Sequence, residues 1–176
     1  ANSLAGVVRV HTEAKTLKMR PVIGCRIETV EGFTFLAYPQ DRAAYGRLTT
    51  LISAGRMGKL DGSWQDKGVC DISLAMLAKH GEGAQLILVP PRDLGEKFTV
   101  PGWASNVIAL DGSVMGGAVT GTLFDILPHL VAGLPTLHHL AASYLYIGDD
   151  IARIDRLDAL ARANGLSLLA TNDVHY

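Results

Sequence analysis

The sequence has few cysteines, few aromatic residues and almost no net charge. Its two cysteines, Cys25 and Cys70, have a spacing that fits neither a zinc site nor a disulfide framework. We interpret them as reduced core thiols, which are typical of a cytoplasmic protein. The formal net charge of −1 excludes a general electrostatic attraction to nucleic acid or to an anionic membrane.

Targeting and membrane segments are also missing from the pattern. The first ten residues, ANSLAGVVRV, lack the basic region and long apolar run of a signal peptide. The most apolar stretch, residues 114–134, contains Asp125 and His129. One aspartate at the centre of a membrane helix costs ~2.5–3.5 kcal/mol on insertion scales. We therefore expect a buried or glycine-rich crossing inside a soluble domain, and no membrane partner.

The sequence does contain enough apolar material for a packed core. Hydrophobic residues make up 48% of the chain and charged residues 19%, a balance typical of globular proteins. With 176 residues, the chain is predicted to form one domain that spans residues 1–176.

Helical and strand patterns alternate along the chain. Predicted helices follow the candidate caps Ser3, Asp41, Asp71 and Asp149-Asp150, the first with the stripe Leu4, Val7, Val8, His11 and Ala14. Predicted strands cover residues 20–30, 32–39, 84–91, 142–147 and 166–171, with a hairpin turn at Glu31-Gly32, a loop over 55–68 and a less legible strand over 103–110. This alternation predicts an α/β fold with parallel strands. No strand pattern precedes the first helix, so we expect that upstream strands of the fold are missing.

The terminal segment "TNDVHY" has the strongest candidates for metal-binding or catalytic side chains. Asp173 and His175 are two residues apart, so on a regular strand both side chains would lie on one face. A carboxylate and an imidazole at the carboxyl end of a parallel strand can bind a divalent metal ion. Two ligands make only half of such a site, and other strand ends should supply the rest.

Other strand ends offer few additional ligands. The first predicted strand carries Arg26 and Glu28, and the strand over 142–147 carries Tyr146 before Asp149, which is more simply a helix cap. Adjacent histidines such as His138-His139 rarely bind one ion. The other histidines are His129 in a poorly legible region, His80 at a helix end and His11 on an inward stripe. The chain contains no nucleophile elbow, no P-loop and no dinucleotide-binding glycine pattern.

Several segments together resemble one known family. "ATNDVHY" resembles the closing metal motif of PHP (polymerase and histidinol phosphatase) domains, in the version found in bacterial C-family DNA polymerases. "KMRPVIGCRIE", "AYPQDRAAYGRLTTLISAGRMGKLDG" and "RIDRLDALARANGLSLLATNDVHY" resemble further segments of that domain. The resemblance is densest over residues 1–72 and 140–176, and "YPQDRAAYGRL" with Gly24-Cys25-Arg26 looks like the error-prone, damage-inducible branch.

The resemblance implies a fold, a parent protein and its partners. The fold would be an incomplete, distorted β/α barrel that lacks its first strand or strands. The parent would be a DNA polymerase of damage-induced mutagenesis and translesion synthesis, acting on DNA and deoxynucleotides with Mg²⁺ and with mutagenesis accessory proteins. The polymerase core would lie beyond Tyr176. No cofactor is expected in residues 1–176.

The departures from the family pattern point to a degenerate metal site. The expected glutamate at position 26 is Arg26, the position after the "LILV" strand is Pro90-Pro91, and another expected glutamate is Tyr146. The upstream histidine motifs of the family do not occur here, so Asp173 and His175 would be remnant metal ligands. A cation at position 26 would repel a bound metal ion, and Arg26 could instead pair with Asp173.

Three hypotheses follow. The first is a structural, non-catalytic PHP-domain fragment of an error-prone DNA polymerase. The alternative is a PHP-type metal-dependent phosphoesterase or 3′–5′ exonuclease acting in proofreading. The third is a plain α/β interaction domain in which "TNDVHY" is coincidental. Because a barrel without its first strands has an open edge, the chain is also predicted to self-associate, by edge pairing or by exchange of the helix around residues 3–18.

Overall fold

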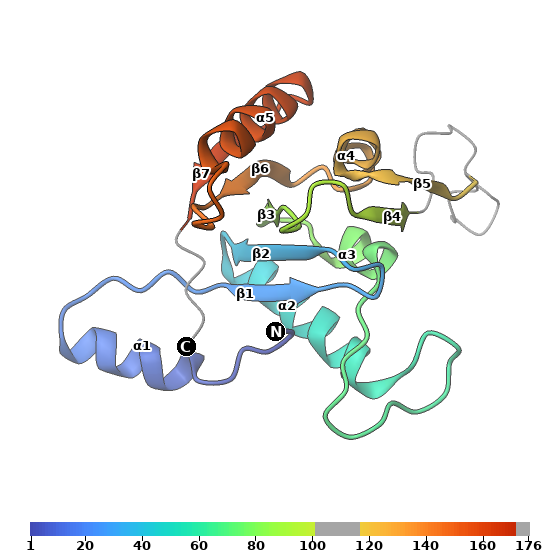
Figure 1. Ribbon diagram of the computed structural model, residues 1–176. Helices are drawn as coiled ribbons and strands as arrows, with labels where there is room; N and C mark the ends of the chain where they lie inside the picture. Colours follow the sequence, from blue (N-terminus) through green and yellow to red (C-terminus); the bar gives the residue numbers. More distant parts are fainter. Residues whose placement is uncertain (101–116, 172–176) are drawn as a thin grey trace. The chain divides into compact units, whose positions relative to one another are not determined.

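The computed structural model describes residues 1–100 and 117–171. Its twelve elements in these ranges are α1 (Val7–Thr16), β1 (Cys25–Glu28), β2 (Thr34–Pro39), α2 (Arg42–Met57), α3 (Leu74–His80), β3 (Ala84–Val89), β4 (Lys97–Val100), β5 (Val119–Thr122), α4 (Leu123–Gly133), β6 (Leu137–Ala142), α5 (Asp150–Ala163) and β7 (Ser167–Ala170) (Figure 1). The predicted strand over residues 103–110 lies outside the described residues.

The chain divides into two compact units. Unit 1 comprises Ala1–Val30 and Thr34–Leu86, and unit 2 comprises Glu31–Phe33 and Ile87–Tyr176. Hydrogen-bonded strands follow the order β1-β2-β3-β6-β7, and β4 and β5 form a separate pair. The division falls inside β3. The chain combines five helices with a five-stranded sheet that has both antiparallel and parallel pairs, within the described residues, and this is compatible with the predicted α/β class.

The hairpin expected around Glu31-Gly32 is present, and both of its strands belong to unit 1. Strands β1 and β2 pair antiparallel, with Cys25 opposite Ala37 and Ile27 opposite Phe35. Gly32 has a φ of 93°, the left-handed conformation that favours glycine in a tight turn. Ile27, Phe35 and Ala37 are fully buried, as the period of two in a half-buried strand predicts.

Helix α2 is fixed by its cap and by its apolar face. Asp41 accepts a hydrogen bond from the Ala44 N–H at 2.7 Å and satisfies one of the unpaired donors of the first turn. Leu48 and Leu51 are buried on the inner face. Near the end of the helix, a Cβ on Gly55 would come within 2.7 Å of the Asp71 carbonyl oxygen, so only glycine fits without movement.

Two helix starts and one core residue in unit 1 differ from the prediction. Helix α1 begins at Val7 after Gly6, because the Ser3 hydroxyl caps a short turn by accepting from the Ala5 N–H at 3.1 Å. Helix α3 begins at Leu74 and is capped by Ser73, which lies nearer to the first apolar residue than Asp71 does. His11 is exposed, because α1 buries only Ala14.

Unit 2 contains the parallel pair expected from the sequence. Strands β6 and β7 run parallel, with His139 opposite Ser167 and Ala142 opposite Ala170. Helix α5 lies between the two strands in the sequence and connects them. Its Leu157 side chain is buried. It ends before Gly165, which has a φ of 71° as a helix-terminating glycine does. The β6–α5–β7 segment is therefore a βαβ unit.

The apolar stretch over 114–134 forms a strand and a helix where the structure describes it. Helix α4 starts with a capping box in which Asp125 accepts from the Thr122 N–H at 2.8 Å, and it contains Pro128. Across residues 1–100 and 117–171, no helix has the length and apolarity needed to cross a membrane.

The strand predicted over 142–147 is wrong in position. Strand β6 ends at Ala142, and residues 143–148 form a loop in which Tyr146 has a φ of 57°. The strand lies five residues earlier because Leu137, Leu140 and Ala141 are buried, with the histidines His138-His139 between them. Those histidines break the apolar pattern that usually identifies a strand.

Candidate functional site

The candidate site lies in unit 2, where β3 and β6 end. Residues 90–95 follow β3, and residues 143–149 (the β6–α5 loop) follow β6. Segments that follow strand ends carry the active sites of many α/β proteins, because a rigid sheet positions them.

A buried aspartate organises the β6–α5 loop. Asp150 is 6% exposed, and its carboxylate accepts hydrogen bonds from the Leu145 N–H at 2.6 Å and the Ile147 N–H at 3.1 Å. Burial by itself would raise the pKa of this carboxyl. The hydrogen bonds from the loop N–H groups outweigh burial and leave the pKa of Asp150 below its ordinary value. The loop is thus held by an ionised carboxylate at the start of α5.

The same helix presents a buried arginine one turn later. Arg153 is 5% exposed, and its Nη2 donates a hydrogen bond to the Pro91 carbonyl oxygen at 2.7 Å. Burial lowers the pKa of the Arg153 guanidinium, and the Asp149 carboxylate opposes that shift. An arginine stays charged at neutral pH, since its pKa lies far above 7. Arg153 therefore ties the segment after β3 to α5 and keeps a positive charge there.

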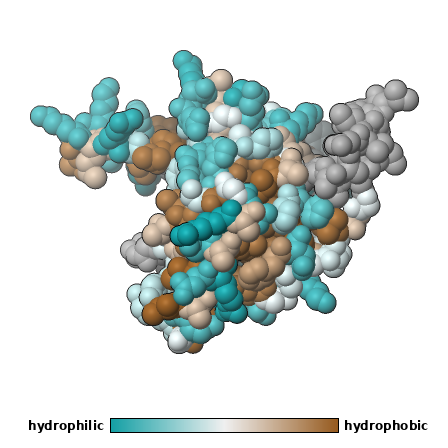
Figure 2. Space-filling view, turned by 90° about the horizontal axis from the view of Figure 1, so that it is seen from above, coloured by the Kyte–Doolittle hydropathy of each residue, from teal (hydrophilic) through white to brown (hydrophobic). Residues whose placement is uncertain are grey.

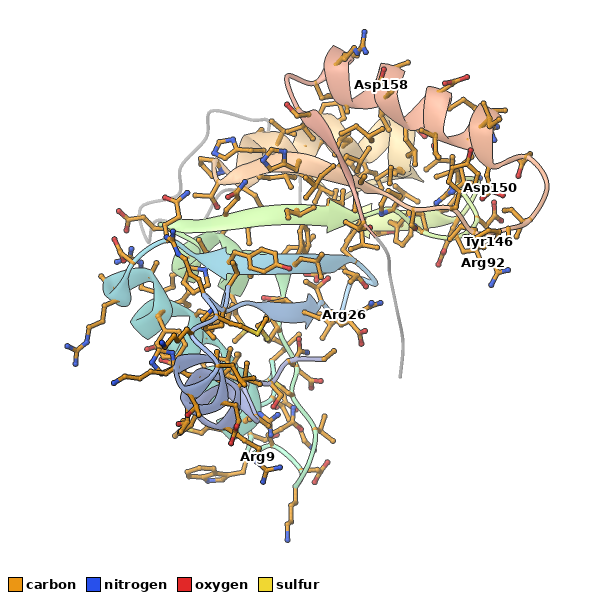
Figure 3. All side chains as sticks on the ribbon, turned by 90° about the vertical axis from the view of Figure 1, so that its left-hand side faces the viewer. Arg9, Arg26, Arg92, Tyr146, Asp150 and Asp158 are labelled. Atoms are coloured by element: carbon orange, nitrogen blue, oxygen red, sulfur yellow. The ribbon has the colours of Figure 1, made fainter. Side chains whose placement is uncertain are left out.

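A cavity of about 500 Å³ lies between these segments. Its charged lining consists of Arg92 and Asp93 from the segment after β3 and Asp149, Arg153 and Arg156 from the start of α5. We call it the arginine pocket. Figure 3 shows Arg92, Tyr146 and Asp150 at the same end of unit 2.

The acidic residues of the arginine pocket already have partners. Arg156 Nη2 lies 3.4 Å from Asp149 Oδ2, in a pair exposed on both sides. Asp93 accepts a hydrogen bond from the Gly95 N–H at 2.8 Å. Arg92 is exposed and forms no hydrogen bond or ion pair with any described residue. The pocket lining carries three positive and two negative side chains, and one guanidinium is uncommitted.

A second hollow, of about 400 Å³, lies where β6 and β7 end. Tyr144 and Tyr146 line it together with Thr171, the last described residue. The two tyrosine rings lie 6.1 Å apart between centroids and are tilted by 48°. Tyr146 is 90% exposed, so one aromatic ring of the β6–α5 loop stands in solvent, and the same loop borders the arginine pocket through Ile147.

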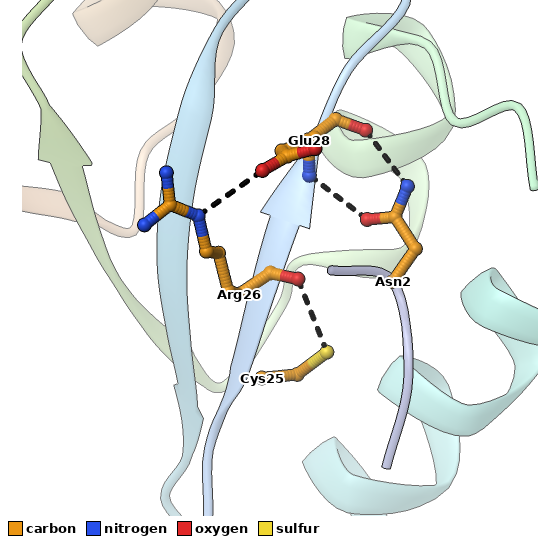
Figure 4. Close-up of polar contacts among 4 residues, drawn as sticks. All are labelled: Asn2, Cys25, Arg26 and Glu28. Atoms are coloured by element: carbon orange, nitrogen blue, oxygen red, sulfur yellow. Dashed lines mark hydrogen bonds and ion pairs between the residues drawn. The ribbon is translucent and has the colours of Figure 1, made fainter. Parts of the chain in front are cut away.

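The predicted metal ligands cannot be placed. Asp173 and His175 lie outside the described residues, so their role as remnant ligands stays a prediction. In unit 1, Arg26 on β1 donates from Nε to Glu28 Oε1 at 3.1 Å (Figure 4). The proposed pairing of Arg26 with Asp173 is also untested for the same reason.

The described residues contain no cluster of metal-ligating side chains. Within residues 1–100 and 117–171, no group of three or more His, Cys, Asp and Glu side chains could hold a metal ion. At the positions where the resemblance expects ligands, Pro90-Pro91 offer no side-chain donor and Tyr146 stands in solvent. The degenerate metal site stays a prediction, because Asp173 and His175 lie outside the described residues.

The remaining candidate residues that the structure describes do not line the arginine pocket. Cys25 is buried, Cys70 is half-buried, and both are free thiols whose pKa is raised chiefly by burial. His80 ends α3, where burial and then Lys79 lower its pKa. His138 and His139 are neighbours on β6 and so point to opposite faces.

Sequence reasoning missed the arginine pocket. The pattern after Asp149-Asp150 predicts a helix from its apolar face, whereas Arg153 and Arg156 are three residues apart and so share one face. That spacing was the available signal. The contribution of Arg92 could not be inferred locally, because Arg153 and Pro91 are separated by 62 positions in the chain.

Comparisons with known proteins give a consistent result. No family model matches the chain. The chain is 34% identical over 176 residues to an error-prone DNA polymerase of Caulobacter vibrioides. The alignment covers 99% of this chain and 13% of that protein. It is 36% identical over 180 residues to an error-prone DNA polymerase of Bradyrhizobium diazoefficiens, covering 99% of this chain and 14% of that protein. An error-prone DNA polymerase 1 of Agrobacterium fabrum is 34% identical over 98% of this chain and 13% of its own length.

These relatives are much longer than the chain. The chain spans 13–14% of the first two, while nearly all of its own residues take part in the alignment. The predicted similarity to error-prone DNA polymerases is therefore confirmed for the segment that this chain represents.

Proposed function

We propose that this chain is a PHP-type structural module of an error-prone DNA polymerase and is not itself catalytic. The observation that carries the proposal is the similarity to error-prone DNA polymerases over 99% of the chain. The "ATNDVHY" motif supports the assignment to the PHP type. The βαβ unit β6–α5–β7 supports an incomplete β/α barrel, because such units are the repeating element of that architecture.

The rest of such a polymerase would perform the chemistry. DNA, deoxynucleotides and Mg²⁺ would bind in a core that lies outside residues 1–176, and mutagenesis accessory proteins would act with it in translesion synthesis. A cytoplasmic location is supported by the two free thiols, which are typical of a reducing compartment.

The structural role rests on what the described residues do. Buried Asn2 donates from Nδ2 to the Glu28 carbonyl oxygen at 3.0 Å, and its Oδ1 accepts from the Glu28 N–H at 2.8 Å (Figure 4). Its Nδ2 also donates to the Cys70 carbonyl oxygen at 3.2 Å. Arg26 pairs with Glu28 in a half-exposed ion pair, which contributes about 0–1 kcal/mol. Where the resemblance expects a glutamate ligand on β1, the side chains thus make packing and hydrogen-bond contacts and do not form an acidic ligand set.

Activity assays test this proposal. The 176-residue chain should not extend a primed template with Mg²⁺ and should not shorten the 3′ ends of single-stranded DNA with Mn²⁺. Degradation that disappears in His175→Ala would contradict a structural role and would favour the exonuclease alternative. The matched control is His138→Ala, an exposed histidine on β6 that should leave any degradation unchanged.

Metal content gives an independent readout. Element analysis of protein purified without chelator should find no transition metal at a stoichiometric level. Near-stoichiometric zinc or manganese that is lost in Asp173→Ala would contradict the degenerate-site proposal. That outcome would leave the relation to error-prone polymerases intact, because the relation rests on sequence similarity.

A further inference from the structure

The arginine pocket gathers more positive charge than its surroundings explain. The whole chain has a formal net charge of −1, yet three guanidinium groups line one cavity of about 500 Å³. Asp149 offsets Arg156 through their contact at 3.4 Å. Asp150 is turned to the N–H groups of the β6–α5 loop rather than to an arginine. Arg92 and Arg153 are left without a carboxylate within salt-bridge distance among the described residues.

The position of Arg153 is suited to holding a ligand. A guanidinium carries five N–H donors, and the structure commits Nη2 of Arg153 to the Pro91 carbonyl oxygen at 2.7 Å. The side chain is fixed by burial, so little conformational entropy would be lost on binding. Arg153 lines the cavity, and each of its side-chain nitrogens is either hydrogen-bonded or reached by solvent. An anion in the cavity would therefore meet this guanidinium.

The chemistry of the pocket favours a phosphate group. Planar guanidinium groups bind phosphate oxygens in pairs, and Arg92 and Arg153 reach the cavity from two different segments. The β6–α5 loop borders this cavity with Ile147 and carries the exposed Tyr146 ring one position earlier. Proteins that bind single-stranded nucleic acid combine positive side chains, which contact the phosphate backbone, with aromatic rings, which stack on the bases.

We propose that the arginine pocket binds a backbone phosphate of single-stranded DNA, with Tyr146 stacking on a neighbouring base. This proposal rests on the proposed function, in which the chain is part of a polymerase that acts on DNA. A free phosphate or nucleotide has the same anionic group, and the experiment separates these sources.

The first experiment measures the affinity of the 176-residue chain for fluorescent oligothymidylate by anisotropy at several salt concentrations. The test variant Arg92→Gln/Arg156→Gln removes two guanidinium groups from the pocket and leaves the buried Arg153 in place. The control variant Arg9→Gln/Arg162→Gln removes the same charge from exposed positions outside the pocket, and Arg162 is likewise ion-paired, with Asp158 at 2.8 Å. Circular dichroism confirms that both variants are folded.

The expected result is a selective loss in the pocket variant. Its affinity should fall about tenfold, and the slope of log K against log salt should become shallower by about 0.7 for each lost phosphate contact. The control variant should keep the affinity and slope of the unmodified chain. Equal losses in the two variants, or no loss in either, would overturn the proposal.

The second experiment separates the sources of the phosphate group. Tyr146→Ser should weaken binding of oligothymidylate about tenfold and leave an abasic oligonucleotide unaffected, because only stacking is removed. Inorganic pyrophosphate and dTTP serve as competitors. The single-strand proposal would be overturned if pyrophosphate or dTTP bound, lost affinity in Arg92→Gln/Arg156→Gln, and oligothymidylate did not bind at all. The assays of primer extension and 3′ degradation do not depend on these results, so the proposed function can stand or fall separately.

Discussion

Helices α1 and α5 differ in how they are held, although the sequence predicts both. Helix α5 buries Asp150, Arg153, Leu157, Leu160 and Ala161, and its first turn organises a loop and a cavity. Helix α1 buries Ala14 alone, and Val8 is 80% exposed. The α1 segment at the left of Figure 2 accordingly has hydrophobic residues on its surface among hydrophilic ones. An apolar stripe at helical spacing therefore predicts a helix without predicting that the stripe is covered.

The largest expected effect is a difference in the free energy of unfolding between substitutions of apolar residues in α5 and in α1. Leu157→Ala in α5 should lower the free energy of unfolding by about 2–5 kcal/mol, because it leaves a cavity at a side chain that is 1% exposed. Val8→Ala in α1 should change it by less than about 0.5 kcal/mol. Urea unfolding followed by circular dichroism measures both. Similar values for the two variants would mean that α1 is packed in solution.

The next prediction concerns the charged residue at the start of α5. Because the pKa of Asp150 is lower in the folded chain than its ordinary value of 3.8, its carboxylate stabilises the fold at pH values above 3.8. This stabilisation should be lost as the pH falls below 3.8 through the folded-state pKa. Asp150→Asn should unfold at a lower urea concentration at neutral pH and should lose that part of the pH dependence.

Asp158→Asn provides the matched control. Asp158 lies on the same helix and forms an exposed ion pair with Arg162. Its substitution should leave the unfolding midpoint and the acid dependence nearly unchanged. An equal loss of stability in both variants would show that general charge, rather than the loop contacts of Asp150, stabilises this end of α5.

A smaller effect tests the helix caps. Ser73→Ala should cost about 1 kcal/mol, because the Ser73 hydroxyl accepts from the Met76 N–H at 3.2 Å in the first turn of α3. Ser3→Ala should cost less, since Ser3 lies before the start of α1 and caps no helix. Thermal unfolding of the two variants measures the difference. A larger loss for Ser3→Ala would place the start of α1 at the position that the sequence suggested.

The smallest expected effect concerns self-association, which we propose to involve the α1 region. Val8, Val22 and Met19 are exposed apolar side chains in and after α1. Burial of such surface contributes about 25 cal/mol per Å², so a weak association is expected. Sedimentation over a tenfold concentration range should show it, and Val8→Glu/Val22→Glu should reduce it. A monomer at every concentration would contradict the proposal.

Much of the local structure follows from neighbouring residues. The Asp41 cap, the turn at Gly32, the β1–β2 hairpin and the end of α5 at Gly165 were predicted, because each depends on contacts within a few positions. The position of β6 was missed because two polar histidines interrupt its buried residues. The metal half-site of Asp173 and His175 stays a prediction, because both residues lie outside the described ones.

The sequence by itself determined the α/β class, most of the helices and strands, and the similarity to error-prone DNA polymerases. Only the tertiary structure decided that Arg92, Arg153 and Arg156 line one cavity and that Asp150 holds the preceding loop. The physical reason is the range of the interactions. Caps and periodicity act over one or two turns, whereas the contact of Arg153 with Pro91 joins residues 62 positions apart that only the folded chain brings together.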